Sequence, residues 1–139
     1  MSVSSIAPVK QAVVKALRDS VALKAAVSNE IHEGISPRAI GYPYCVYDIS
    51  WSVRSYDWTS NEIRLGVGVW IISDEQIEAQ NLDALVIEAL HDKALSLGTS
   101  GLTSVYCRRI SDDSMVDLDD AGKKIYQIGG THEVWVIGS

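Results

Sequence analysis

The amino-acid sequence predicts an α+β fold, in which a mainly antiparallel, four-stranded sheet packs against one long helix and an N-terminal pair of helices. Apolar residues recur at helical spacing in two regions, and a period of two marks the strands that lie between them. Turn residues separate these regions, and no repeat or linker interrupts the 139 residues. We therefore expect a single domain, spanning residues 1–139, in which helices cover a sheet.

Two helices are expected at the start of the chain. The first covers about Ala7 to Arg18, and the spacing i, i+4, i+7 and i+8 gives it one apolar face. This face consists of Val9, Val13, Ala16 and Leu17. The Asp19-Ser20 pair offers an N-cap for a second, shorter helix over Val21 to Val27. Glycines and a proline then predict a loop over residues 29–42, with a short strand around Ile31.

A period of two begins at Tyr44 and predicts an antiparallel hairpin. One face of the first strand holds Cys45, Tyr47, Ile49, Trp51 and Val53. One face of the second strand holds Ile63, Leu65, Val67, Val69 and Ile71. Residues 56–61 form the turn between the two strands. Gly66 and Gly68 lie within the second strand rather than at a strand-to-helix turn, so they do not form a phosphate-binding loop.

The long helix and two more strands complete the predicted fold. Ser73 to Gln76 form a capping box, so the helix is expected to begin there and to run to about Leu95. Its buried stripe consists of Leu82, Leu85, Val86, Ala89 and Leu90. The third and fourth strands are expected over about Leu102 to Ile110 and Lys124 to Ile137. Gly129-Gly130 predicts a bulge or a point of close backbone approach.

The charge balance argues against binding to nucleic acid or to an anionic membrane. The chain has 12 basic and 18 acidic residues, a net charge of −6 and a pI near 4.9. Binding through phosphates needs clustered lysine and arginine, but here only Arg108–Arg109 and Lys123–Lys124 form pairs. The longest apolar run, Leu65 to Ile72, is too short for a transmembrane helix, and we expect no secretory signal.

No pattern of residues predicts catalysis, a metal site or a cofactor. The three histidines, His32, His91 and His132, lack the spacing of a zinc site. The sequence contains no nucleophile elbow, no P-loop and no dinucleotide-binding motif. The two cysteines, Cys45 and Cys107, form no CxxC pair and are expected to be buried thiols. We therefore expect no catalytic residue, no metal ligand and no cofactor.

Aspartates are concentrated near the C-terminus. They are Asp112, Asp113, Asp117, Asp119 and Asp120. A calcium loop that starts at Asp117 is excluded, because two ligand positions fail and the twelfth position is Ile128. Two interpretations remain. The segment is the solvated tip of a hairpin, where aspartate opens the turn and glycine closes it, or it is a functional acidic surface.

Tyr56 and Trp58 are the candidate interface residues. Both lie in the predicted loop between the first two strands, and large aromatic side chains on loops often anchor interfaces. The alternative is that both side chains fold back over the edge of the sheet. Trp51 and Trp70 belong to strand patterns, and Trp135 is expected in the core or on a sheet face.

Several segments along most of the chain match a known pattern. They begin with V-A-L-K-A-A-V over Val21 to Val27, a Pro-Tyr strand opener at Tyr42 to Val46, and I-R-L-G-V-G-V-W over Ile63 to Trp70. The long helix follows, then an arginine-bearing strand over Val105 to Ile110, an Asp-Asp-Ala-Gly turn, and a closing strand that contains Tyr126. In these features the chain resembles the tail terminator proteins of bacteriophages with long non-contractile tails, also called tail-completion or head-to-tail joining proteins.

The resemblance implies a structural virion protein without enzyme activity or cofactor. Such a protein forms a ring, usually of six copies, that caps the tail tube, ends its polymerisation and joins the tail to the head connector. The implied partners are further copies of the chain, the tail-tube protein and the connector or neck protein. DNA would pass through the channel without specific binding, and no membrane is involved. The implied location is the head–tail junction of the virion, after assembly in the host cytoplasm.

Two alternatives to a tail terminator remain. One is a head-closure or neck protein of the connector, and the other is a small-ligand-binding α+β domain, which would need a pocket with convergent polar groups. Within the ring, we expect the segment from Asp112 to Asp120 to line or border the lumen, where it would repel DNA. We expect Tyr56 and Trp58 to contact a neighbouring subunit or the tube. Pairing of sheet edges is one way to close such a ring.

Overall fold

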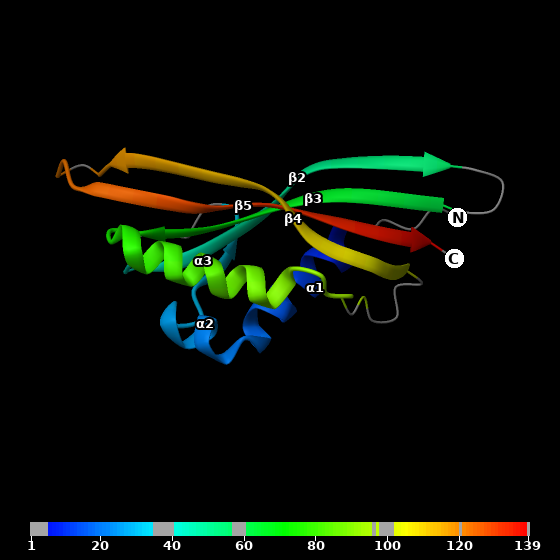
Figure 1. The fold of residues 1–139 in the computed structure, drawn as a ribbon, viewed down its shortest axis with the longest axis horizontal. Helices are drawn as coiled ribbons and strands as arrows, with labels where there is room; N and C mark the ends of the chain where they lie inside the picture. Colours follow the sequence, from blue (N-terminus) through cyan, green and yellow to red (C-terminus); the bar gives the residue numbers. More distant parts are fainter. Residues whose placement is uncertain are drawn as a thin grey trace.

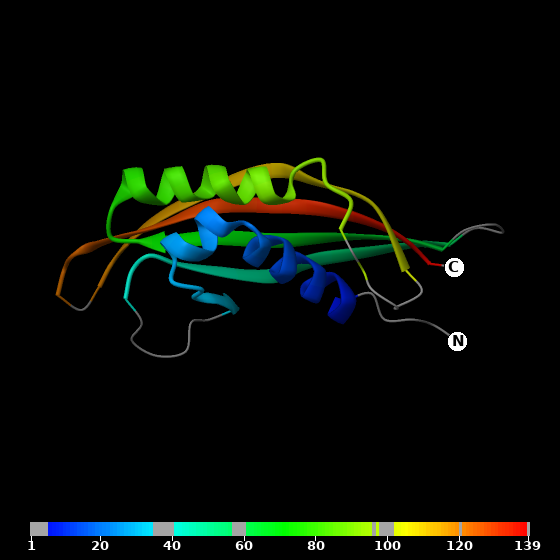
Figure 2. The same cartoon turned by 90° about the horizontal axis from the view of Figure 1, so that it is seen from below.

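The chain folds into one sheet with the helices on one of its faces (Figures 1 and 2). The computed structural model describes residues 6–34, 41–56, 61–95, 97, 102–119 and 121–138. In chain order the elements are α1 (Ile6–Asp19), α2 (Val21–Ala26), β1 (Ile31–Glu33), β2 (Tyr44–Tyr56), β3 (Asn61–Ser73), α3 (Gln76–Leu90), β4 (Leu102–Leu118) and β5 (Lys124–Gly138). None of the described helices is long and apolar enough to cross a membrane.

The sheet has the strand order β1-β2-β3-β5-β4. The pairs β2–β3, β3–β5 and β5–β4 are antiparallel, whereas β1 is parallel to Cys45–Tyr47 of β2. The predicted α+β fold with a mainly antiparallel sheet is therefore confirmed. The described sheet has five strands rather than the predicted four, because the short strand expected around Ile31 pairs with β2 and joins the sheet.

The core lies between the sheet and the helix layer. The predicted apolar face of β3 is at most 2% exposed, because it packs against the helix layer. The apolar faces predicted for the helices are also confirmed. Val9, Val13 and Leu17 of α1 are buried, as are Leu82, Val86 and Leu90 of α3, while Ala16, Leu85 and Ala89 pack partly buried against them.

The ends of α3 differ from the prediction. The helix begins at Gln76, with Glu75 rather than Ser73 as its N-cap, and the Ser73 hydroxyl accepts a hydrogen bond from the Glu75 N–H at 3.1 Å. The helix ends at Leu90 instead of Leu95, because Asp92 has a positive φ of 55°. From there the Asp92 N–H donates to the carbonyl of Cys107 at 2.7 Å, which ties the chain to β4.

The helix-free face of the sheet is covered by its own tryptophans. A Cβ at Gly66 would lie 2.3 Å from the Trp51 indole, and one at Gly68 would lie 2.0 Å from the Trp70 ring, so both indoles lie flat over glycine. The prediction that Trp51 shares a face with Cys45 is wrong. The register shifts between Ile49 and Trp51, and this β-bulge turns Trp51 to the opposite face.

The acidic segment is a strand and not the tip of a hairpin. β4 extends to Leu118, well past the predicted end at Ile110, and Asp112, Asp113 and Asp117 pair with Gly130, Gly129 and Ile125 of β5. The ladder to β5 outweighs the low strand preference of aspartate, because the three carboxylates stay exposed. The turn itself begins at Asp119, whose carboxylate accepts hydrogen bonds from the N–H groups of Ala121 and Lys123.

Candidate functional site

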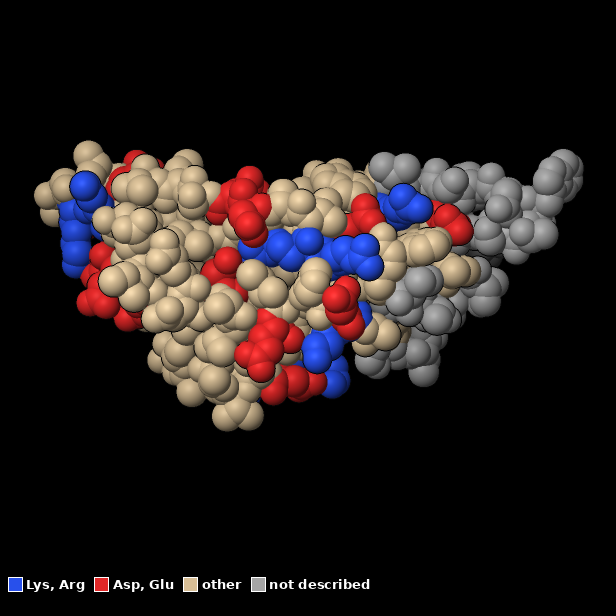
Figure 3. Space-filling view, in the orientation of Figure 1, with Lys and Arg blue, Asp and Glu red and all other residues tan. Residues whose placement is uncertain are grey.

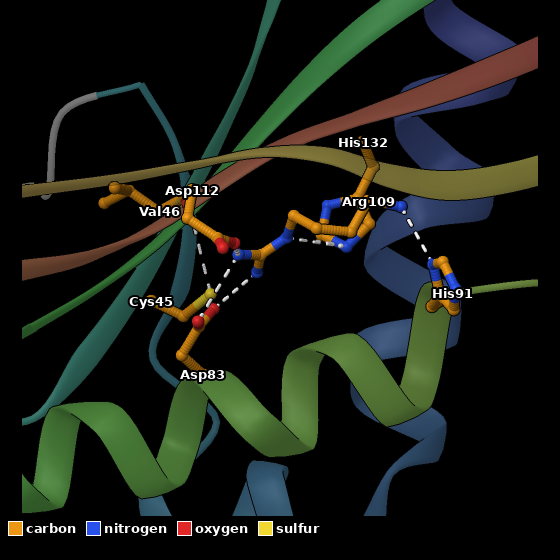
Figure 4. Close-up of polar contacts among 7 residues, drawn as sticks. All are labelled: Cys45, Val46, Asp83, His91, Arg109, Asp112 and His132. Atoms are coloured by element: carbon orange, nitrogen blue, oxygen red, sulfur yellow. Dashed lines mark hydrogen bonds and ion pairs between the residues drawn. The ribbon is translucent and has the colours of Figure 1, made fainter.

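The most highly connected polar group of the described residues is the guanidinium of Arg109 on β4. It joins three elements: β4, the helix α3 and the strand β5 (Figure 4). Its Nη2 lies 2.5 Å from Oδ1 of Asp83 on α3, and its Nη1 lies 2.8 Å from Oδ1 of Asp112. The Nε of Arg109 donates to Nε2 of His132 on β5 at 3.3 Å, and the backbone N–H of Arg109 donates to Nδ1 of His91 at 3.0 Å. The Arg109 side chain is only 7% exposed.

His132 is neutral in this cluster. Its pKa is lowered to about 3, chiefly by burial and then by the nearby Arg109 and His91, while Asp112 opposes the shift. The neutral ring can therefore accept the hydrogen bond from Arg109 at Nε2, while its Nδ1 has no hydrogen-bond partner in the described part of the chain. A base with so low a pKa is poorly matched to proton transfer near neutral pH. The cluster is therefore structural: it holds α3 against β4 and β5.

This burial predicts a pH-dependent stability. Between pH 6.5 and about 3 the unfolded chain protonates His132 while the folded chain keeps it neutral, so the free energy of unfolding falls as the pH falls. From pH 7 to pH 5 we expect this group alone to remove about 2 kcal/mol. Urea unfolding at both pH values, for wild type and His132→Gln, measures the effect. Equal losses in the two proteins would show that His132 does not contribute.

The described residues give no support to nucleophilic or metal chemistry. Cys45 and Cys107 are free and buried, as predicted, and burial raises the pKa of both thiols to about 12. Both therefore stay protonated, and a protonated thiol is a poor nucleophile. In the same described part of the chain, no group of three or more histidine, cysteine, aspartate or glutamate side chains could hold a metal ion.

The predicted acidic surface is divided between the two faces of the sheet. Asp112 points to Arg109 on the helix side (Figure 4). Asp113 is opposite Gly129 and Asp117 is opposite Ile125, positions that alternate to the helix-free face. Asp119 opens the turn, and Asp120 lies outside the described residues. The structure thus brings Asp113 and Asp117 onto one face but does not unite the five aspartates in one cluster.

The other predicted surface is at the opposite end of the sheet. Tyr56 is the last residue of β2 rather than a loop residue, because it pairs with Asn61 of β3. Trp58 lies outside the described residues. Figure 1 shows the end of β2 and the start of β3 at one end of the long sheet, and the end of β4 and the start of β5 at the other. Tyr56 therefore lies at the opposite end of the strands from Asp117 and Asp119.

Two features were missed by the reasoning from sequence. One is which strands form the edges of the sheet: β4 on one side, and on the other β2 beyond the short β1. The other is a group of exposed apolar side chains on the acidic strand, where Met115, Val116 and Leu118 are 54–61% exposed. The apolar group could have been recognised in the sequence, because these three residues lie among the carboxylates of a segment that was assigned to a polar turn.

Charges are interspersed on the face of the molecule that carries α3 and β4. Figure 3 shows lysine and arginine beside aspartate and glutamate on this face, with no continuous basic patch. Among the described residues, charges of opposite sign form ion pairs, such as Lys123 with Asp74 at 2.7 Å.

Comparisons with known proteins agree with the predicted family. The model of the family "Tail completion protein gp17" matches residues 11–128. The fold is similar to a chain in a solved structure titled "Virion of native gene transfer agent (GTA) particle", with a TM-score of 0.70 and 18% identity over 91% of this chain and 92% of that one. A search of curated proteins found no matching relative. Since the family model spans most of its residues, the chain belongs to the tail completion protein gp17 family and is a structural protein of a phage-type tail.

Proposed function

We propose that the chain forms a ring that caps the tail tube, ends its polymerisation and joins the tail to the head connector, leaving a channel for DNA. The observation that carries this proposal is that the sheet has two unlike edges, each open over part of its length in the described residues. In this part of the chain no strand lies beyond β4, whose outer edge is bonded by residues 91–93 at Cys107 and Arg109 but has no outer partner over residues 110–118. On the other side, β1 covers only Cys45–Tyr47 of β2 and leaves residues 48–56 without an outer partner in the described part. Unlike edges favour head-to-tail contacts, which close into rings.

The directions of these edges fit a rotational assembly. Three antiparallel pairings separate β2 from β4, so the two edge strands run in opposite directions. A rotation that keeps the strands of all copies in the same orientation would therefore bring β4 of one copy beside β2 of the next as a further antiparallel pair. Such pairing would satisfy the backbone groups that are still free along the open parts of both edges.

In this ring we assign the helix-free face of the sheet to the channel. This face carries the exposed carboxylates of Asp113, along the channel wall, and of Asp117, at the rim where β4 ends. Like charges would keep passing DNA from adhering to the wall. Asp112, in contrast, is held by Arg109 on the helix side. At the end of the sheet where β2 meets β3, we place a contact of Tyr56 and Trp58 with a neighbouring subunit or with the tube. The chain acts in this proposal as a single domain.

Electron microscopy of particles that lack this protein tests the proposal. We expect overlong or unattached tails, because tube polymerisation would continue past its normal end and the finished tube would lack its joint to the head. Tails of normal length beside leaking heads would instead identify a head-closure protein and overturn the assignment. Normal particles would refute any role at the junction.

A further inference from the structure

Exposed apolar side chains gather at the end of the molecule formed by the turn between β4 and β5. We call this end the hairpin end (Figure 1). Of the seven large apolar residues that are exposed in the described part, five lie here: Tyr42, Ile77, Met115, Val116 and Leu118. Their exposed fractions range from 41% to 73%, although exposed apolar surface of this density is unfavourable in water. Such a patch indicates a contact surface.

A pocket of about 270 Å³ opens at the hairpin end. Its lining is mainly aromatic and aliphatic, with two carboxylates and an amide: Tyr42, Tyr44, Ile72, Met115, Asp117, Leu118, Asp119, Ile125 and Gln127. Sites for metabolites and cofactors span roughly 300–1,000 Å³, so this pocket is small for such a ligand. Its volume suits a single side chain of a partner.

The charges around the pocket indicate which kind of partner side chain it can bind. None of its lining residues is basic, and the nearby amine of Lys123 is paired with Asp74. Asp117 is exposed and forms no ion pair within the described residues, so its charge is available to a cation. Burial raises the pKa of Tyr42, and the neighbouring Tyr44, Asp119 and Asp74 raise it further, as expected where negative groups surround the phenol.

The aromatic wall favours arginine over a simple apolar residue. The rings of Tyr42 and Tyr44 are stacked at 5.8 Å with an angle of 17°, and Tyr42 is 41% exposed. A planar guanidinium can stack on such a ring while its N–H groups reach a carboxylate. We propose that the pocket receives an arginine side chain from an apolar and basic segment of a partner protein that abuts the hairpin end. The identification of the partner as an axial neighbour in the tail rests on the proposed ring. The preference of the pocket for arginine does not depend on the ring.

Binding of a model arginine to the whole chain tests this proposal. The chain has two methionines, Met1 and Met115, so labelling of methionine methyl groups places one of only two signals in the pocket. We expect N-acetyl-arginine amide, at millimolar concentration, to shift the Met115 signal in a saturable way and to leave Met1 unchanged. The uncharged isostere N-acetyl-citrulline amide should bind at least about fivefold more weakly, because it lacks the charge.

Matched variants identify the carboxylate. Asp117→Asn should weaken binding of the arginine probe by about three- to fivefold, as expected for an exposed ion pair. Asp113→Asn removes the same charge from the same strand and face, outside the pocket, and should leave the binding constant unchanged. Equal affinity for the citrulline probe, equal weakening in both variants, or a Met115 shift that follows protein concentration instead of probe would overturn the proposal. None of these outcomes depends on ring formation, so failure here leaves the proposed function standing, and the reverse also holds.

Discussion

Replacement of Arg109 by alanine should lower the free energy of unfolding by about 3–5 kcal/mol, the range found when one partner of a buried ion pair is removed. The carboxylate of Asp83 would remain on α3 with a side chain only 14% exposed and with no other basic partner among its described contacts. His132 would lose its hydrogen bond at Nε2. The variant therefore leaves a buried charge and a buried acceptor without partners, and both penalties destabilise the folded state.

Urea unfolding of three variants isolates this effect. Arg108→Ala is the matched control, because Arg108 is the neighbouring arginine but its side chain is 55% exposed and its 3.6 Å contact is to an exposed Asp92. It should cost less than about 1 kcal/mol. The double variant Arg109→Leu with Asp83→Leu should recover much of the loss, since an apolar pair can replace a buried ion pair. If Arg109→Ala costs no more than Arg108→Ala, the cluster does not hold α3 on the sheet.

Strands with one unbroken period could be predicted from the sequence together with their buried face, whereas for strands with a bulge only the presence and the start of the strand could be predicted. β3 alternates without interruption, and its buried face is the predicted one. In β2 the bulge between Ile49 and Trp51 reverses the alternation, and in β4 the register shifts twice, between Ser104 and Tyr106 and between Arg109 and Ser111. A bulge depends on the register with the partner strand, which the pattern of one strand does not contain.

The contact surfaces were harder to predict for a similar reason. Arg109 and Asp83 are 26 positions apart, and they meet only because α3 packs across β4 and β5. The acidic segment was interpreted by its aspartates, which are typical of turns. Its apolar residues Met115 and Leu118 line a surface pocket because β4 continues through the segment to the hairpin end.

Substitution of Gly130 by alanine should destabilise the fold by about 3 kcal/mol, at the upper end of the range for inserting a methyl group into a packed interior. A Cβ at this position would lie 1.9 Å from the carbonyl oxygen of Ser111 and 2.9 Å from Nη1 of Arg109. The first neighbour is backbone at the β4 bulge, so relief requires the strand to move rather than a side chain to rotate. That movement would also disturb the contact of Arg109 with Asp83, so part of the cost of Gly130→Ala comes from a weakened ion pair.

The same substitution at Gly41 is the control for the general effect of glycine-to-alanine replacement on the conformational entropy of the unfolded chain. No atom lies within 4 Å of a Cβ at Gly41, so Gly41→Ala should change the free energy of unfolding by less than about 1 kcal/mol. Urea unfolding of both variants gives the comparison. Because the clash at Gly130 acts through the strand that bears Arg109, combining Gly130→Ala with Arg109→Ala should cost clearly less than the sum of the two single losses. If the two losses of unfolding free energy add strictly, the close approach of β5 to the bulge and the ion pair to α3 are independent. Arg109 would then not contribute to fixing the position of β4 at the bulge.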